Sequence, residues 1–299
     1  MKAKIFTLLF GCVMITFGSM AQNFKTFTID GALTIGAMRK GTDAIPEKPG
    51  NPPTPAIPAT PGSVEVVVSA DFDLTKCMVH YELDAAGGEI DPTTPLANNS
   101  VVDLSAPKTI LMKSTAVPAG KDVVITVKRL NPATALPITI SFDTDGLKTA
   151  DWTSSTIGWA FSGIDVGQKS TARYGTVGVS FIVGFPAIPA DGSYAVDYNL
   201  WCVGSNFSAK PLSDFIVQAS ADGLAWRTLA NYTATSNPSL IITTPKPASP
   251  IFSNKLQVGE KYVKWVYVTR DGLNVNVDDI TVRQGVPTAI NDMEMAGVS

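Results

Sequence analysis

The fold is decided by a stretch near the C-terminus, Phe215-Ile-Val-Gln-Ala-Ser-Ala-Asp-Gly-Leu-Ala-Trp226. Apolar residues occupy every second position from Phe215 to Ala219, the pattern of a strand with one buried face. The pair Asp222-Gly223 follows, and such a pair readily adopts the positive φ of a tight hairpin turn. A second strand then begins at Trp226. The stretch therefore predicts a hairpin in an antiparallel sheet.

Two later stretches extend this pattern. Tyr262-Val-Lys-Trp-Val-Tyr267 and Asn274-Val-Asn-Val-Asp-Asp-Ile-Thr-Val282 both alternate in the manner of strands. Together with the hairpin motif Ser-x-Asp-Gly-x-x-Trp, they resemble the galactose-binding-like jelly-roll modules of secreted bacterial surface proteins. The resemblance implies a scaffold and does not name a ligand.

The composition predicts an all-β chain. Only 16% of residues are charged, while 24 Gly and 21 Pro favour short strands joined by turns. The net charge of −3 and the lack of any basic cluster beyond pairs such as Lys128-Arg129 exclude a nucleic-acid footprint. After the N-terminal segment, no stretch approaches the ~20 apolar residues of a membrane helix.

Residues 1–21 are predicted to be a removable export signal. A basic start at Met1-Lys-Ala-Lys4 precedes an apolar run from Ile5 to Phe17 and a small-x-small cleavage site at Ser19-Met-Ala21. A lipoprotein signal ending at Cys12 is the alternative, although the apolar region before that cysteine would be very short. We therefore expect a protein exported to the cell surface or the medium.

Removing the signal leaves about 280 residues, which at about 100–200 residues per domain predicts two domains. Residues 22–62 carry strands at Phe24–Ile29 and 33–38 and then a Pro-rich tract, expected to be an extended spacer within the first sandwich. Recognition of a partner by this tract is the alternative.

Residues 63–130 contain short strands about ten residues apart, as in a small β-sandwich. The turns Asp71-Phe-Asp-Leu-Thr75 and Asp103-Leu-Ser-Ala-Pro107, with the strands that follow them, resemble the immunoglobulin-like spacer modules of surface proteins from gut and oral bacteria. The predicted fold is therefore an immunoglobulin-like β-sandwich followed by a β jelly roll.

Residues 131–284 are assigned to the jelly roll, which opens with a strand at Pro137–Asp143. Residues 285–299 contain Thr288-Ala-Ile-Asn-Asp292, which resembles the linker into a type IX secretion sorting domain. Since the sequence stops at Ser299, either that domain has been truncated or the resemblance is incidental.

Catalytic motifs are not recognisable in the sequence. The single histidine, His80, is expected on the outward face of its strand as a surface residue, because a catalytic histidine needs a positioned partner. A pair of carboxylates forming a glycan hydrolase is the remaining catalytic alternative. Cys77 and Cys202 are expected to be free and buried, with a disulfide between the domains as the alternative.

Three carboxylates suggest a metal site. Asp143 ends the first jelly-roll strand, while Asp278 and Asp279 lie in the last one, and these strands are commonly neighbours in jelly rolls. Oxygen-rich sites of this kind suit Ca²⁺. The resemblance also implies a structural calcium ion here. The alternative is that these residues cap turns.

Aromatic residues are candidates for sugar contacts, because a pyranose ring stacks on them through its apolar face. Those expected in loops are Trp152, Trp159 and Tyr174. Those expected in the core, from their positions in strands, are Trp201, Trp226 and Trp265.

The sequence therefore predicts a non-catalytic, exported adhesion or carbohydrate-binding protein, with a glycan or surface polysaccharide as partner. A structural surface component without a soluble ligand is the main alternative. Exposed aromatics that converge with polar groups would favour binding, whereas filled faces would favour a structural role.

Overall fold

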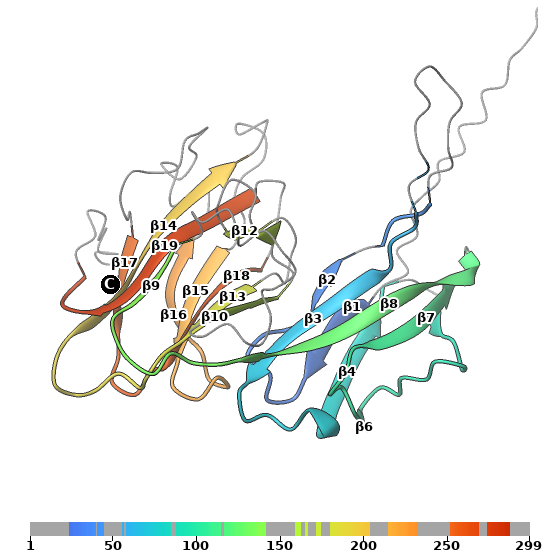
Figure 1. Cartoon of the computed structure of the whole chain (residues 1–299), viewed down its shortest axis with the longest axis horizontal. Helices are drawn as coiled ribbons and strands as arrows, with labels where there is room; N and C mark the ends of the chain where they lie inside the picture. Colours follow the sequence, from blue (N-terminus) through green and yellow to red (C-terminus); the bar gives the residue numbers. More distant parts are fainter. Residues whose placement is uncertain are drawn as a thin grey trace, which may run out of the picture.

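The computed structural model of the chain shows an all-β protein made of several sheets, as predicted (Figure 1). It describes residues 24–39, 41–44, 56, 58–84, 88–114, 117–141, 159–162, 165–166, 172–174, 180–203, 215–232, 252–268 and 274–287.

The N-terminal sandwich comprises the strands up to residue 130 and one short 3₁₀ turn. Its elements are β1 (Phe24–Ile29), β2 (Ala37–Arg39), β3 (Gly62–Ser69), η1 (Leu74–Lys76), β4 (Cys77–Leu83), β5 (Glu89–Ile90), β6 (Ser100–Val102), β7 (Lys108–Ser114) and β8 (Val117–Leu130). One sheet has the order β1-β4-β6 and the other β2-β3-β8-β7-β5. Strands β3 and β8 pair in parallel, whereas their neighbours pair antiparallel.

The core of this sandwich follows from period-two alternation. Val64, Val66 and Val68 of β3 are fully buried in it, and Cys77 is buried there as a free thiol, as predicted. His80 lies on the other face of β4, where its ring contacts Asp30 and Asn99. Its outward orientation was predicted, whereas its two polar partners were not.

The C-terminal sandwich follows the connection at residues 131–137. Its strands are β9 (Ile138–Ile140), β10 (Trp159–Ser162), β11 (Asp165–Val166), β12 (Ala172–Tyr174), β13 (Ser180–Gly184), β14 (Tyr194–Val203), β15 (Phe215–Ser220), β16 (Arg227–Tyr232), β17 (Phe252–Leu256), β18 (Tyr262–Tyr267) and β19 (Asn274–Gln284).

These strands form two antiparallel sheets. One has the order β10-β13-β18-β15-β16, and the six-stranded sheet has the order β11-β12-β19-β14-β17 with β9 beside β19. From β13 to β15, and again from β16 to β19, successive strands cross from one sheet to the other. This connectivity is that of a jelly roll.

The predicted hairpin is confirmed. Strand β15 pairs with β16 on one side and with β18 on the other. Gly223 in the connecting turn has a φ of +80°, a conformation that a residue with a side chain rarely adopts. Trp265 of β18 is fully buried in the core between the two sheets.

The predicted strand at residues 33–38 is shorter than expected, because only Ala37–Arg39 pairs with β3. The Leu33 amide instead donates to the Val67 carbonyl at 2.8 Å, and the Val67 amide donates to Thr34 Oγ1 at 2.9 Å. These bonds turn Leu33 away from a sheet position, and it packs against the C-terminal sandwich.

Candidate functional site

The six-stranded sheet of the jelly roll has two unlike faces. Along β14, Val196, Tyr198 and Leu200 point into the apolar core. The alternating Asp197 and Asn199 therefore lie on the outer face, together with Trp201. The sheet thus carries polar side chains on the side opposite the core.

A bulge in β19 keeps the apolar side chains of this strand on the inner face and its polar side chains on the outer face. Asn199 pairs with Asp278 and Asp197 with Thr281, so the residue between them on β14 stands opposite two residues of β19. Asp279 lies in this bulge with a φ of +47°. Because the extra residue shifts the alternation, Ile280 points into the core as Val277 does, and Asp278 and Asn276 remain on the outer face.

Hydrogen bonds join the bulge to β14. The Asp278 Oδ1 atom accepts from the Asp279 amide at 2.7 Å, and Asn199 Nδ2 donates to Asp279 Oδ2 at 2.8 Å. An L-residue at positive φ is strained, and Asp tolerates this region better than most. The bulge is therefore held by its own carboxylates and by one amide of the neighbouring strand.

A second acidic group lies further along the same face. Asp197 Oδ2 accepts from Arg283 Nε at 2.5 Å, and Asp197 Oδ1 accepts from the Ser253 hydroxyl. Arg283 comes from β19 and Ser253 from β17, so the Asp197 carboxylate links three strands. Its charge is balanced by the Arg283 guanidinium group.

These outer-face side chains are buried despite their polarity. Asn199 and Asp278 have no exposed surface, and Asn276 is 3% exposed. Burying a carboxylate costs free energy unless hydrogen bonds or a cation compensate. Carboxylate and amide oxygens in such a place can hold a hard cation, and they can also accept hydrogen bonds from hydroxyl groups. Within the described ranges, no three His, Cys, Asp or Glu side chains converge as a metal site.

Two of the three predicted metal ligands lie among the described residues. Asp278 and Asp279 lie in the bulge, while Asp143 falls outside the described residues. Strand β9 pairs with β19, with Ile140 opposite Ile280. The first and last jelly-roll strands are therefore neighbours, as expected.

The predicted aromatic ligands do not all lie in loops. Trp152 falls outside the described residues. Trp159 begins β10 and Tyr174 ends β12, so the expectation of loops is wrong for the backbone of these two. β12 pairs with β19, which places Arg173 opposite Asn276 and Tyr174 opposite Val275. The register thus brings Tyr174 to a strand beside the acidic bulge.

Trp265 and Trp201 are both buried as predicted, Trp265 between the two sheets and Trp201 on the other face of the six-stranded sheet. Trp201 is 4% exposed and alternates with the core residues of β14, so it lies on the outer face. Trp226 is partly buried where the two sandwiches meet. Asp197, Asn199 and Asn276 were not predicted as site residues, although their alternation with the apolar residues is visible in the sequence.

The inner face has its own polar contact. The hydroxyls of Tyr198 and Tyr232 lie 2.7 Å apart, and Tyr198 also donates to Asn254 Oδ1 at 2.7 Å. Burial raises the pKa of both phenols well above the usual value. This contact satisfies buried hydroxyls, and it lies on the opposite side of the sheet from the acidic bulge.

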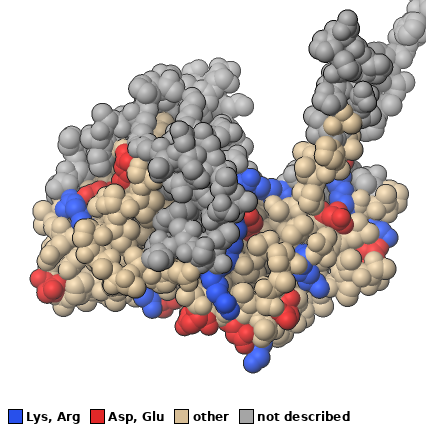
Figure 2. All heavy atoms as spheres, in the orientation of Figure 1, with Lys and Arg blue, Asp and Glu red and all other residues tan. Residues whose placement is uncertain are grey.

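Charges are mixed on the visible surface. On the face shown in Figure 2, the Lys and Arg side chains of the described residues are interspersed with Asp and Glu. This distribution does not resemble the basic stripe of a nucleic-acid-binding surface. No helix in the described part of the chain is long and apolar enough to span a membrane.

No protein-family model matches the chain, and no curated protein sequence matches it. Solved structures do show similarity. A Bacteroides thetaiotaomicron protein described as a candidate glycoside hydrolase is 10% identical with a TM-score of 0.34, and the match covers 88% of this chain and 97% of that one.

Two further structures match about half of the chain. The K1 cleaved adhesin domain of Lys-gingipain from Porphyromonas gingivalis is 17% identical with a TM-score of 0.31, covering 51% of this chain and all of the domain (100%). The N-terminal cellulose-binding domain of β-1,4-glucanase C from Cellulomonas fimi is 12% identical with a TM-score of 0.28. The match covers 43% of this chain and 90% of that domain. Since these TM-scores are all below 0.5, they support no functional inference.

Proposed function

We propose that the chain is an exported, non-catalytic glycan-binding or adhesion protein, whose jelly roll carries the binding site at the cell surface or in the medium. The single observation that carries this proposal is the outer face of the six-stranded sheet. This face buries a carboxylate and two amides, Asp278, Asn199 and Asn276, outside the apolar core. Because these side chains have little or no exposed surface, their part in this proposal is to support a cation beside the site, while aromatic side chains contact the glycan.

In this proposal, Asp278 and Asp279 hold a Ca²⁺ ion together with Asp143. The positive φ of Asp279 turns the backbone at the bulge, and bulges are common beside functional sites because they redirect side chains. The ion would neutralise a buried carboxylate and fix the chain beside the site. Trp152, Trp159 and Tyr174 would supply the stacking surfaces for the glycan.

A glycan-array screen of the mature protein, residues 22–299, tests the binding function. We expect a limited set of glycans to be retained, with binding reduced at least tenfold by Trp159→Ala and by Tyr174→Ala. Val258→Ala serves as the control, because this side chain is 64% exposed at a turn between β17 and β18. Absence of glycan binding by the folded protein would favour a structural surface component.

Calcium is tested separately from the glycan. A ligand that binds only the folded state raises the free energy of unfolding by mass action, by about 2.7 kcal/mol at a concentration one hundred times Kd, and therefore raises the melting temperature. We expect a chelator to lower the melting temperature and added calcium to restore it. Identical melting curves in chelator and in excess calcium would show that the three carboxylates bind no calcium and only cap turns.

A further inference from the structure

The two sandwiches share a buried apolar cluster. Its members from the N-terminal sandwich and its connection are Leu33, Val67 and Leu130, and those from the jelly roll are Ile182, Tyr262 and the partly buried Trp226. Leu33 is 2% exposed and Val67 is fully buried. Figure 1 shows the sandwiches side by side, with β8 leading directly from one into the other. Continuous burial of this kind resembles the inside of one domain more than a linker between two.

Leu33 is the central side chain of this contact. Its amide is bonded to the Val67 carbonyl, and the neighbouring Thr34 hydroxyl accepts from the Val67 amide. The loop carrying Leu33 is therefore fixed to β3 before any contact with the jelly roll is considered. A pre-positioned side chain loses little conformational entropy when it enters a partner surface.

The jelly roll has a socket for Leu33 at its β15–β16 turn. A Cβ atom built on Gly223 would lie 2.2 Å from Leu33 Cδ2, which is closer than real Cβ atoms approach. Gly223 is therefore required for space as well as for its positive φ. Tyr262 and Trp226 line the same place, and the Trp226 indole donates to the Gly223 carbonyl at 2.9 Å.

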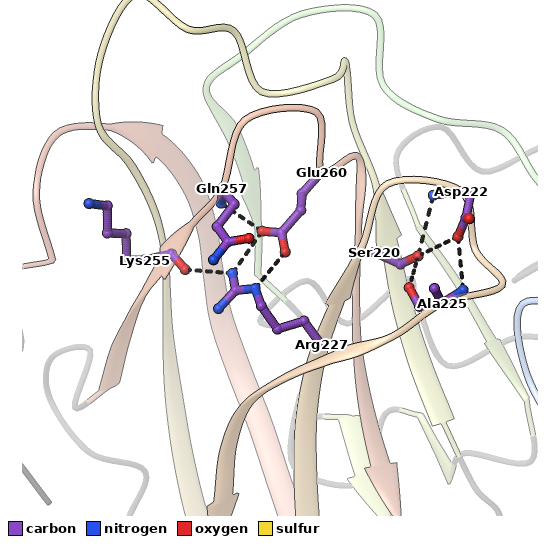
Figure 3. Close-up of polar contacts among 7 residues, drawn as sticks. All are labelled: Ser220, Asp222, Ala225, Arg227, Lys255, Gln257 and Glu260. Carbon is purple, nitrogen blue, oxygen red and sulfur yellow. Dashed lines mark hydrogen bonds and ion pairs between the residues drawn. The ribbon is translucent and has the colours of Figure 1, made fainter.

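The turn that forms the socket is braced on both sides (Figure 3). Asp222 Oδ1 accepts from the amides of Leu224 and Ala225 at 2.8 and 2.9 Å, and the Ser220 hydroxyl donates to the Ala225 carbonyl. After the turn, Arg227 pairs with the buried Glu260 through two bonds of 2.9 Å. The socket is thus held by the jelly roll itself.

Lys264 closes the contact. Its ammonium group lies 3.7 Å from the centre of the Trp226 ring and donates to the Leu33 carbonyl at 3.2 Å. A lysine placed between an indole face and a backbone carbonyl of the other sandwich connects the two through a cation–π contact and a charge-assisted hydrogen bond. Burial lowers the Lys264 pKa to about 8.

We propose that Leu33 and its socket of Gly223, Trp226, Tyr262 and Lys264 lock the two sandwiches in one orientation. The chain then moves and unfolds as one body, and the N-terminal sandwich acts as a fixed arm that presents the jelly roll at a constant angle. The hairpin motif that identifies the jelly roll in the sequence is, in this chain, also its joint. The proposal concerns the arrangement of the sandwiches and does not depend on the ligand.

Differential scanning calorimetry and small-angle X-ray scattering of the mature protein test the lock. We expect one cooperative transition and a compact particle for the unmodified chain. Leu33→Ser should split the transition into two and increase the maximum dimension of the particle. Ile35→Ala, a change at a 52% exposed residue of the same loop, should do neither.

Lys264→Met provides a second variant that leaves both cores untouched, and we expect it to lower the cooperativity of the same transition. Two independent transitions in the unmodified chain would overturn the proposal. Retention of a single transition and of an unchanged scattering profile in both Leu33→Ser and Lys264→Met would also overturn it. If Leu33→Ser does not fold, the result for Lys264→Met decides.

Discussion

The two faces of the six-stranded sheet are both buried, yet they are built from opposite kinds of side chain. Leu200 and Val277 on the inner face have no exposed surface, and neither do Asn199 and Asp278 on the outer face. The inner face gains stability from transfer of apolar area out of water, whereas the outer face incurs a desolvation cost. Burial alone therefore does not identify an apolar core.

The largest effect is expected on the inner face. Leu200→Ala removes a fully buried side chain between the sheets and leaves a cavity, so it should lower the free energy of unfolding by about 2–5 kcal/mol. Urea unfolding of the purified variant measures this change. Val258→Ala at an exposed site should stay within about 0.5 kcal/mol. A comparable loss from both variants would contradict the assigned core.

A smaller loss is expected from the paired charge on the outer face. Arg283→Met removes the guanidinium that Asp197 faces, leaving a nearly buried carboxylate, which should cost about 1–3 kcal/mol. Adding Asp197→Asn should recover part of the loss, because the uncompensated charge is then gone. Equal stability of the single and double variants would show that the two residues do not interact.

The hydroxyl pair of the inner face should contribute less still, and its contribution should depend on pH. Tyr198→Phe removes two hydrogen bonds and should cost about 1 kcal/mol at pH 8. Because burial raises the pKa of Tyr198, its contribution is complete below the unfolded value of about 10 and is lost as the pH rises beyond it.

Melting temperatures between pH 8 and pH 11 measure this dependence. The unmodified chain should lose more stability above pH 10 than Tyr198→Phe does. Parallel curves for the two proteins would mean that the phenol is not shielded from solvent as the structure indicates.

The smallest effect on stability is expected at the bulge. Asn tolerates positive φ about as well as Asp, so Asp279→Asn should change the free energy of unfolding by no more than about 0.5 kcal/mol in a chelator. In calcium, the same variant should lose the increase in melting temperature proposed for the unmodified chain. A full calcium response in the variant would remove Asp279 from the proposed site.

Sequence alternation was sufficient for most of this arrangement. It predicted the β15–β16 hairpin and the strand β18 with its bounds, and the jelly-roll assignment predicted that the first and last strands are neighbours. Trp201 is buried as expected, and its phase relative to Val196, Tyr198 and Leu200 places it on the face of β14 opposite the apolar core.

The bulge at Asp279 and the position of Leu33 could not be predicted from the pattern of one strand, because both depend on long-range contacts. The bulge at Asp279 exists because two residues of β19 stand opposite one of β14, and this pairing is formed between segments about 80 residues apart. Leu33 leaves its strand pattern for a socket in the other sandwich. In both cases a tertiary contact overrides the local period.

The position of β19 in the sheet has a consequence for the order of folding. This strand pairs with β9, β12 and β14, so the jelly roll lacks a central strand until residues 274–284 are available. The N-terminal sandwich has all its strands by Leu130. Closing β9 onto β19 requires a loop of more than 130 residues, and such non-local pairing slows folding. During synthesis, the N-terminal sandwich can therefore fold first. The contact between Leu33 and the jelly roll forms only after the last strand has been made.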